Sequence, residues 1–297
     1  RNYERIIWSG WFYEQYKKDR DFEDYQLNNV TLGNDTINST DLIQQKWLDN
    51  HFYGGIFSID YKQETFELTL GGGWNRYTGD HFGEVIWAQF ASNSEMRHRW
   101  YEGDGDKKDF NVYSKLKYHF SSQLSTYLDL QYRKINYDIT GIDDDLRDIT
   151  QSHDFNFFNP KVGLFYEIND LHSGYLTFAV ANREPNRSNY TDADPNQPAP
   201  TYETLYDTEL GYNYNSTNKY IKANFYYMYY IDQLVLTGEI NDVGSAIMTN
   251  VDESFRLGLE ISGGVRLFNK LQVDANITLS KNKINDFTEY IDNWDTW

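Results

Sequence analysis

One run of cationic and aromatic side chains is the chain's clearest candidate for ligand binding. Arg97, His98, Arg99 and Trp100 follow one another and precede Tyr101. Arginine pairs well with carboxylate or phosphate oxygens, and an indole ring stacks on flat ligands. A histidine between two arginines is also compatible with a haem or an anionic ligand. The alternative left open is an ordinary loop cluster that holds no ligand.

A second candidate group lies in another long polar stretch. Arg183, Arg187 and Tyr190 offer the same combination of guanidinium groups and an aromatic ring. The competing interpretation is that Arg183 and Arg187 only brace the end of a strand and the loop after it. Both groups therefore predict contacts to a bound ligand rather than catalysis.

The chain shows no pattern typical of catalysis or metal binding. Its six histidines lack the H-E-x-x-H spacing, and the acidic run over 102–109 lacks the EF-hand spacing. The absence of cysteine excludes thiolate chemistry and disulfides. Asp207 and Glu209 are expected to lie side by side and to form hydrogen bonds rather than act as acid and base. We predict no catalytic residue, no metal ligand and no cofactor, so the protein is not expected to be an enzyme.

The elements that must position these residues are strands with period-2 alternation. Around residue 255, Phe255, Leu257 and Leu259 share one parity, while Arg256 and Glu260 share the other. One face of such a strand is apolar and the other is polar. About eleven strands are expected, the first over 6–17. The pairs that follow cover 53–61 with 66–70, 110–118 with 126–132, 158–166 with 176–180, 206–214 with 221–229, and 255–267 with 271–279.

Short turns and long connections are expected to alternate along the chain. Long polar segments are predicted over 19–43, 77–109, 140–154, 183–203 and 238–250. Short turns are predicted at 63–64, 121–122, 169–170, 215–218 and 269–270. Outer-membrane barrels have this asymmetry, with short periplasmic turns and long external loops. A soluble antiparallel sheet packed on a core remains the alternative.

Composition favours the membrane barrel. The chain has 297 residues, and its 8 Trp, 26 Tyr and 18 Phe suit strands and the membrane–water boundary. No apolar run is long enough for a helical span. The formal net charge of -18 argues against nucleic acid as a partner. An apolar parity facing lipid and a charged parity facing a wet lumen predict an all-β, antiparallel transmembrane β-barrel.

An odd strand number indicates that the chain is part of something larger. Bacterial single-chain barrels have even strand counts. Eleven strands therefore predict a portion of a larger barrel, with other strands outside residues 1–297.

Five segments in order resemble the TonB-dependent outer-membrane receptor family. They are Asn159–Gly163, which matches the family's "NPKvGl" strand start; Tyr175–Arg187, with its strand-end arginine and proline; Pro200–Tyr212, similar to "P-x-x-E…ELGy"; Asp232–Gly238, similar to "DqlvlTG"; and Asn250–Glu260, similar to "N-x…s-x-R-x-Gle". The Tyr- and Asn-rich strands resemble Bacteroidetes members of the family. Together these segments cover a little under half of the chain.

The resemblance implies a barrel of about 22 strands with a plugged lumen, of which residues 1–297 are the central part. It implies an integral protein of the outer membrane of a Gram-negative bacterium, with extracellular long loops. The implied function is TonB-dependent uptake of a scarce nutrient complex, foremost a ferric siderophore or other iron complex. Cobalamin, haem and oligosaccharide remain open as cargo. Alternatives from other classes are a passive porin-like channel and a soluble β-rich carbohydrate-binding or hydrolytic domain.

The family also implies the partners. The TonB complex would act through a plug segment that this sequence does not contain, and outer-membrane lipid and lipopolysaccharide would surround the barrel. A surface lipoprotein partner is left open. Arg97, His98, Arg99, Trp100, Arg183, Arg187 and Tyr190 are the residues expected to contact the small-molecule cargo.

Overall fold

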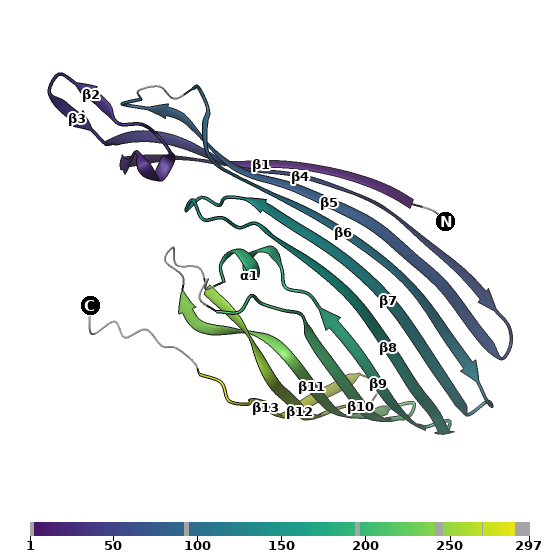
Figure 1. Cartoon of the computed structure of the whole chain (residues 1–297). Helices are drawn as coiled ribbons and strands as arrows, with labels where there is room; N and C mark the ends of the chain where they lie inside the picture. The colour runs from purple at the N-terminus through teal and green to yellow at the C-terminus, as the bar shows by residue number, and fades with distance from the viewer. Residues whose placement is uncertain (1–2, 92–94, 194–196, 241–245, 269, 289–297) are drawn as a thin grey trace, which may run out of the picture. The chain divides into compact units, whose positions relative to one another are not determined.

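The computed structural model describes residues 3–91, 95–193, 197–240, 246–268 and 270–288. An 11-stranded sheet dominates it, and each strand pairs with the next one along the chain, in the order β1-β4-β5-β6-β7-β8-β9-β10-β11-β12-β13 (Figure 1). The predicted all-β, antiparallel class is confirmed. The strands of this sheet are β1 (Tyr3–Asp21), β4 (Ser39–Lys62), β5 (Phe66–Ala88), β6 (His98–His119), β7 (Leu124–Gly141), β8 (Gln151–Asn169), β9 (His172–Arg183), β10 (Glu203–Asn215), β11 (Lys219–Ile240), β12 (Ala246–Leu267) and β13 (Leu271–Ile284).

Three kinds of smaller element lie in the connections. A 3-10 helix, η1 (Glu23–Tyr25), and a two-stranded sheet of β2 (Val30–Leu32) and β3 (Asp35–Ile37) lie between β1 and β4. A short helix, α1 (Arg187–Thr191), lies between β9 and β10. No helix within the described ranges is both long enough and apolar enough to cross a membrane.

Contacts divide the chain into two compact units. Unit 1 comprises Arg1–Ser58, Gly72–Asn111 and Arg133–Asn156, and unit 2 comprises Ile59–Gly71, Val112–Tyr132 and Phe157–Trp297.

A continuous apolar row crosses six strands of unit 2. The register places Leu164, Leu176, Leu210, Phe225, Leu259 and Leu279 side by side, from β8 to β13. Leu210 is 57% exposed and Leu279 is 60% exposed. Because these side chains stay exposed, the apolar parity faces outward and is not the core of a sandwich. This facing agrees with the expectation of a lipid-facing surface.

The opposite parity of the same strands is polar. One row runs through Lys161, Ala179, Asp207, Met228, Arg256 and Asn282. Four residues further along the strands, another row on the same face runs through Tyr175, Gly211, Asn224, Glu260 and Thr278. Mid-strand cations and carboxylates on one face therefore lie behind an apolar face, as a hydrated interior requires.

Aromatic rings lie toward both ends of the apolar face of unit 2. Toward one end, the ring centroids of Tyr206 and Tyr229 are 6.5 Å apart. Toward the other, His172 packs against Tyr214 with centroids 4.9 Å apart, and its Nδ1 lies 2.6 Å from the Tyr212 hydroxyl. Tyrosine places an apolar ring and a polar tip at such a boundary. Between these two ends, the apolar row is leucine except for Phe225.

Alternation of short and long connections is confirmed, although the long ones are shorter than expected. β5 continues to Ala88 and β6 begins at His98, so most of the segment expected to be a loop over 77–109 is strand. β11 and β12 likewise take up much of 238–250, whereas β7 and β8 cover only 140–141 and 151–154 of the segment expected over 140–154. Backbone pairing continues there without apolar alternation, which is why periodicity missed it. The expected turn residue Asn269 lies outside the described residues.

Candidate ligand-binding site at the strand ends

Both arginines of the first predicted group lie beside the carboxylate of Glu84, and Arg99 also donates to Glu102 Oε1 at 2.7 Å. Arg97, with a left-handed φ of 62°, immediately precedes β6. Its Nε donates to Glu84 Oε2 at 2.8 Å, and Arg99 Nε lies 3.5 Å from Glu84 Oε1. Arg97 also donates to Gln45 Oε1, and the guanidinium carbon of Arg99 lies 3.8 Å from the ring centroid of Phe82. Both guanidinium groups are therefore already engaged within the protein.

His98 and Trp100 are engaged elsewhere. A ring nitrogen of His98 lies 2.9 Å from the carbonyl oxygen of Tyr25, and since a carbonyl only accepts, the ring N–H donates. Trp100 is 2% exposed and packs against Tyr25 and Tyr101, each with a ring centroid 5.0 Å away. Trp100 is thus part of an apolar cluster with Leu42 and Val85 and not an exposed loop side chain.

The sheet places the residues of the run from Arg97 to Trp100 in two different environments. Gln44 accepts a hydrogen bond from the Tyr25 hydroxyl at 2.8 Å, whereas Gln45 accepts from Arg97. Neighbouring residues in a strand point to opposite faces. The structure therefore places the Trp100 cluster with Gln44 on one face of β4 and the arginine pair with Gln45 on the other.

η1 covers the aromatic cluster. Phe22 before it is buried, and Gln26 after it takes a left-handed φ of 51° and donates from Nε2 to the carbonyl oxygen of Trp100 at 2.9 Å. Burial is the main cause that raises the pKa of Tyr25. Tyr25 therefore remains a phenol that donates to Gln44, and the turn is fixed to the sheet.

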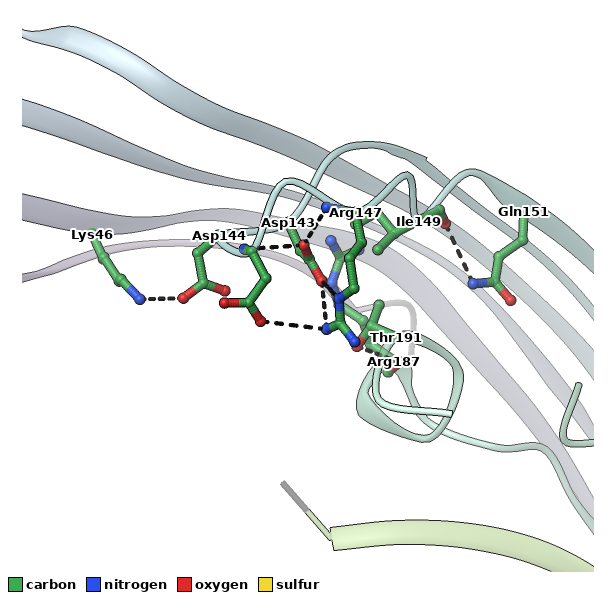
Figure 2. A network of polar contacts seen from close by, with 9 residues as sticks. Lys46, Asp143, Asp144, Arg147, Ile149, Gln151, Arg187 and Thr191 are labelled. Atoms are coloured by element: carbon green, nitrogen blue, oxygen red, sulfur yellow. Dashed lines mark hydrogen bonds and ion pairs between the residues drawn. The ribbon is translucent and has the colours of Figure 1, made fainter. Parts of the chain in front are cut away.

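A loop organised by one aspartate lies beside η1. The carboxylate of Asp143 accepts from the backbone N–H of Asp145 at 3.1 Å and of Arg147 at 2.9 Å, and from Arg147 Nε at 2.9 Å (Figure 2). The next residue, Asp144, forms an ion pair with Lys46 of β4. The loop between β7 and β8 is thus tied to itself and to the sheet.

These elements enclose a cavity of about 340 Å³ within unit 1. Two aromatic side chains and one amide side chain form its floor, and charged side chains of both signs form its rim. The floor comprises Tyr25, Gln44 and Trp100; the cations are Lys17, Arg20 and Lys46; the carboxylates are Asp24, Asp144 and Asp145; and Leu146 completes the lining.

Arg183 of the second predicted group pairs with a glutamate in unit 2. Arg183 Nε and Nη2 each lie 3.0 Å from an oxygen of Glu203, which also accepts from the backbone N–H of Leu234 at 3.1 Å. Arg187 is the first residue of α1, and Tyr190 in the same helix is 5% exposed. Asn186 and Asn189 cap this helix reciprocally. Arg183 thus braces the start of β10.

Unit 2 has a larger cavity of about 590 Å³ near the ends of β11 and β12. Within the part of the chain that the structure describes, its lining includes Glu239, Asp252, Glu253 and Asp286 and no basic side chain. Among the described residues, no group of three His, Cys, Asp or Glu side chains is arranged to hold a metal ion. The two cavities therefore differ in their charge.

Sequence reasoning found Trp100 of the unit 1 cavity but missed its other lining residues. Lys17, Gln44 and Asp145 lie far apart in the chain, and only pairing of β1 with β4 and folding of two loops brings them together. No spacing motif signals such a set. Glu84 and Glu203 were missed for the same reason, because their arginine partners lie 13 and 20 residues away.

Comparisons with known proteins define the class. Residues 3–296 match the family model "TonB dependent receptor-like, beta-barrel", so the chain belongs to this family. The predicted family is confirmed. Its members are outer-membrane receptors and transporters and not enzymes, and this chain is a β-barrel portion of such a protein.

Solved structures share the fold. The copper transporter OprC matches with a TM-score of 0.67 and 13% identity over 84% of this chain and 42% of that one. The FrpB iron transporter from Neisseria meningitidis matches with a TM-score of 0.56 and 14% identity over 83% of this chain and 40% of that one. The ferripyoverdine receptor of Pseudomonas aeruginosa matches with a TM-score of 0.57 and 11% identity over 97% of this chain and 39% of that one. The chain thus spans about two fifths of these structures' length. No curated protein matches its sequence.

Proposed function

We propose that the protein to which this chain belongs imports an iron complex, such as a ferric siderophore, across the outer membrane in a TonB-dependent way. The observation that supports this proposal is the family match over residues 3–296. Several solved structures with this fold bear names of iron transporters or siderophore receptors, including FrpB and the ferripyoverdine receptor.

The proposal includes the place of this chain in the whole protein. Residues 1–297 form the central part of a barrel of about 22 strands, which surrounds a plug that contacts TonB. The connections that contain η1, β2, β3 and α1 face the outside of the cell, and the short turns face the periplasm. The outward apolar row of unit 2 supports the contact with lipid.

Uptake in cells tests the function. The full-length gene is expressed in a Gram-negative strain that lacks its own siderophore receptors, and uptake of radioactive iron is followed with a panel of ferric siderophores. Uptake of at least one complex that stops on deletion of tonB is the expected result. Copper ions serve as the competing cargo, because OprC shares the fold. Uptake of copper alone, or uptake that persists without TonB, would contradict the proposal.

Labelling of intact cells tests the orientation. A cysteine at Gly33, in the tip between β2 and β3, should react with a membrane-impermeant maleimide. A cysteine at Ser122, in the turn between β6 and β7, should react only after the outer membrane is opened. The reverse order of reactivity would contradict the proposed orientation.

A further inference from the structure

The unit 1 cavity presents two cations whose charge no carboxylate neutralises. Lys46 is paired with Asp144, but neither Lys17 nor Arg20 has a carboxylate within ion-pair distance among the residues that the structure describes. Both line the cavity. A lysine and an arginine converging on one space favour an oxyanion, because each can donate charge-assisted hydrogen bonds to it.

Two of the three rim carboxylates, Asp144 and Asp145, oppose an anion less than an unpaired aspartate would, whereas no ion pair involves Asp24 among the described residues. Asp144 is occupied by Lys46, and Asp145 lies 3.7 Å from Arg147. Burial, followed by the charges of Asp144 and Asp143, raises the pKa of Asp145. Asp145 therefore carries less negative charge at mildly acidic pH than an exposed aspartate would.

Buried side chains close the floor of the cavity. The rings of Tyr25 and Trp100 contact each other at an interplanar angle of 50°, and Gln44 beside them holds the Tyr25 hydroxyl. Tyr25 is 8% exposed and Gln44 and Trp100 are each 2% exposed, so these side chains close the floor and leave little ring surface for stacking. About 340 Å³ is enough for a small ring system with one charged substituent.

The walls are held in place without a ligand. Gln26 donates to the carbonyl oxygen of Trp100 and His98 to that of Tyr25, and both bonds fix the η1 turn to β6. Asp143 fixes the loop that supplies Asp144 and Asp145. A site whose groups are already positioned loses little entropy on binding.

We propose that this cavity binds a small organic oxyanion such as a carboxylate, with Lys17 and Arg20 holding the anion above the Tyr25 and Trp100 floor. Its role as a contact for cargo rests on the import function proposed above. The site lies apart from Arg97 and Arg99, whose guanidinium groups are engaged by Glu84 on the other face of β4.

Binding of benzoate to the full-length receptor in detergent tests the site. Benzoate has a ring and a carboxylate, and benzamide has the same shape without the charge. Titration calorimetry should give a Kd for benzoate at least about tenfold lower than for benzamide, as the loss of a charge-assisted hydrogen bond predicts. Equal affinities, or no detectable binding of benzoate to the folded wild type, would overturn the proposal.

Charge-removing variants test the residues. Lys17→Gln combined with Arg20→Gln should weaken benzoate binding by at least about tenfold and leave benzamide binding unchanged. The matched control is Lys18→Gln, because Lys18 is the next residue of β1 and does not line the cavity. Unchanged benzoate binding in the double variant would overturn the assignment. If the double variant does not fold, as judged by heat-modifiable migration, Arg20→Gln alone is compared with Lys18→Gln.

The site and the import function can fail separately. Wild-type receptor that imports an iron complex but binds benzoate and benzamide equally would overturn only the site. Receptor that binds benzoate through Lys17 and Arg20 but supports no TonB-dependent uptake would overturn only the import function.

Discussion

The ring of Tyr175 lies directly over Gly211 of the neighbouring strand. A Cβ built on Gly211 would come within 2.0 Å of a Tyr175 ring carbon, so only glycine fits there. Beyond the glycine, the Tyr175 hydroxyl donates to Asn224 Oδ1 at 3.1 Å, so one side chain of β9 connects three strands. Tyr226 covers Gly258 and Tyr220 covers Gly264 in the same way.

Gly211→Ala should destabilise the barrel. The added methyl group must displace the Tyr175 ring and its hydrogen bond to Asn224, and overpacking of this kind costs about 1–3 kcal/mol. Gly174→Ala is the control, because a Cβ there would meet only the Gly211 carbonyl oxygen at 3.4 Å. Urea unfolding followed by heat-modifiable migration should show a lower midpoint for Gly211→Ala alone. Equal midpoints would mean that the ring can move at little cost.

Leu259→Arg should impair barrel assembly more than Glu260→Arg. Leu259 belongs to the apolar row between Phe225 and Leu279, and a cation near the lipid midplane costs about 2–4 kcal/mol. Glu260 belongs to the polar row on the other face, where water surrounds a cation. The folded fraction of the two variants in outer membranes, measured on gels, gives the comparison. Equal folded fractions would contradict the assigned facing.

Asp143→Asn should loosen the loop between β7 and β8. An amide keeps the shape but presents one acceptor oxygen, whereas the carboxylate receives two backbone N–H groups and the Arg147 guanidinium. Hydrogen exchange of peptides that cover 142–148 should become faster. Asp145→Asn is the comparison, because Asp145 only approaches Arg147 at 3.7 Å, and its effect should be smaller. The opposite ranking would show that Asp143 does not organise the loop.

Acid should open the same loop at its other end. Hydrogen bonds from the side chain and then the backbone N–H of Thr150 lower the pKa of Asp148. Because the folded pKa lies below the unfolded value of about 3.9, this stabilisation is present above that value and is lost as the pH falls through the folded pKa. Hydrogen exchange at Thr150, corrected for its intrinsic pH dependence, should rise at the acid end in the wild type. The Asp148→Asn variant lacks the titrating carboxyl, so its hydrogen exchange at Thr150 should not change over this pH range. A change in that variant would show that Asp148 is not the group that opens the loop.

Strand pairing was predictable where one face meets lipid and the other meets water. In the pair around Phe255, alternation and the turn before Leu271 follow directly from the sequence and agree with the register of β12 and β13. Beyond the apolar belt, as over 77–88 of β5, both faces are polar or packed under loops. Alternation disappears there while hydrogen bonding continues, so sequence periodicity underestimated strand length.

The candidate site was less predictable than the fold. The run from Arg97 to Trp100 was singled out from the sequence as a ligand-binding candidate, but alternation across β6 and pairing with other strands place its members in different surroundings. The cavity depends on Lys17, Gln44 and Asp145, which no local pattern links. Such a site arises from register and loop packing, which a single sequence does not encode in any short spacing.

Consecutive pairing of β4 through β13 also bears on how the protein is assembled. From β4 to β13, consecutive strands of the chain are hydrogen-bonded to each other, and no connection crosses another. Growth of the sheet can therefore proceed hairpin by hairpin, with each newly added edge serving as the template for its successor. Insertion machinery that handles such a chain needs to shield only two edges from hydrocarbon, that of the first strand and that of the strand added last.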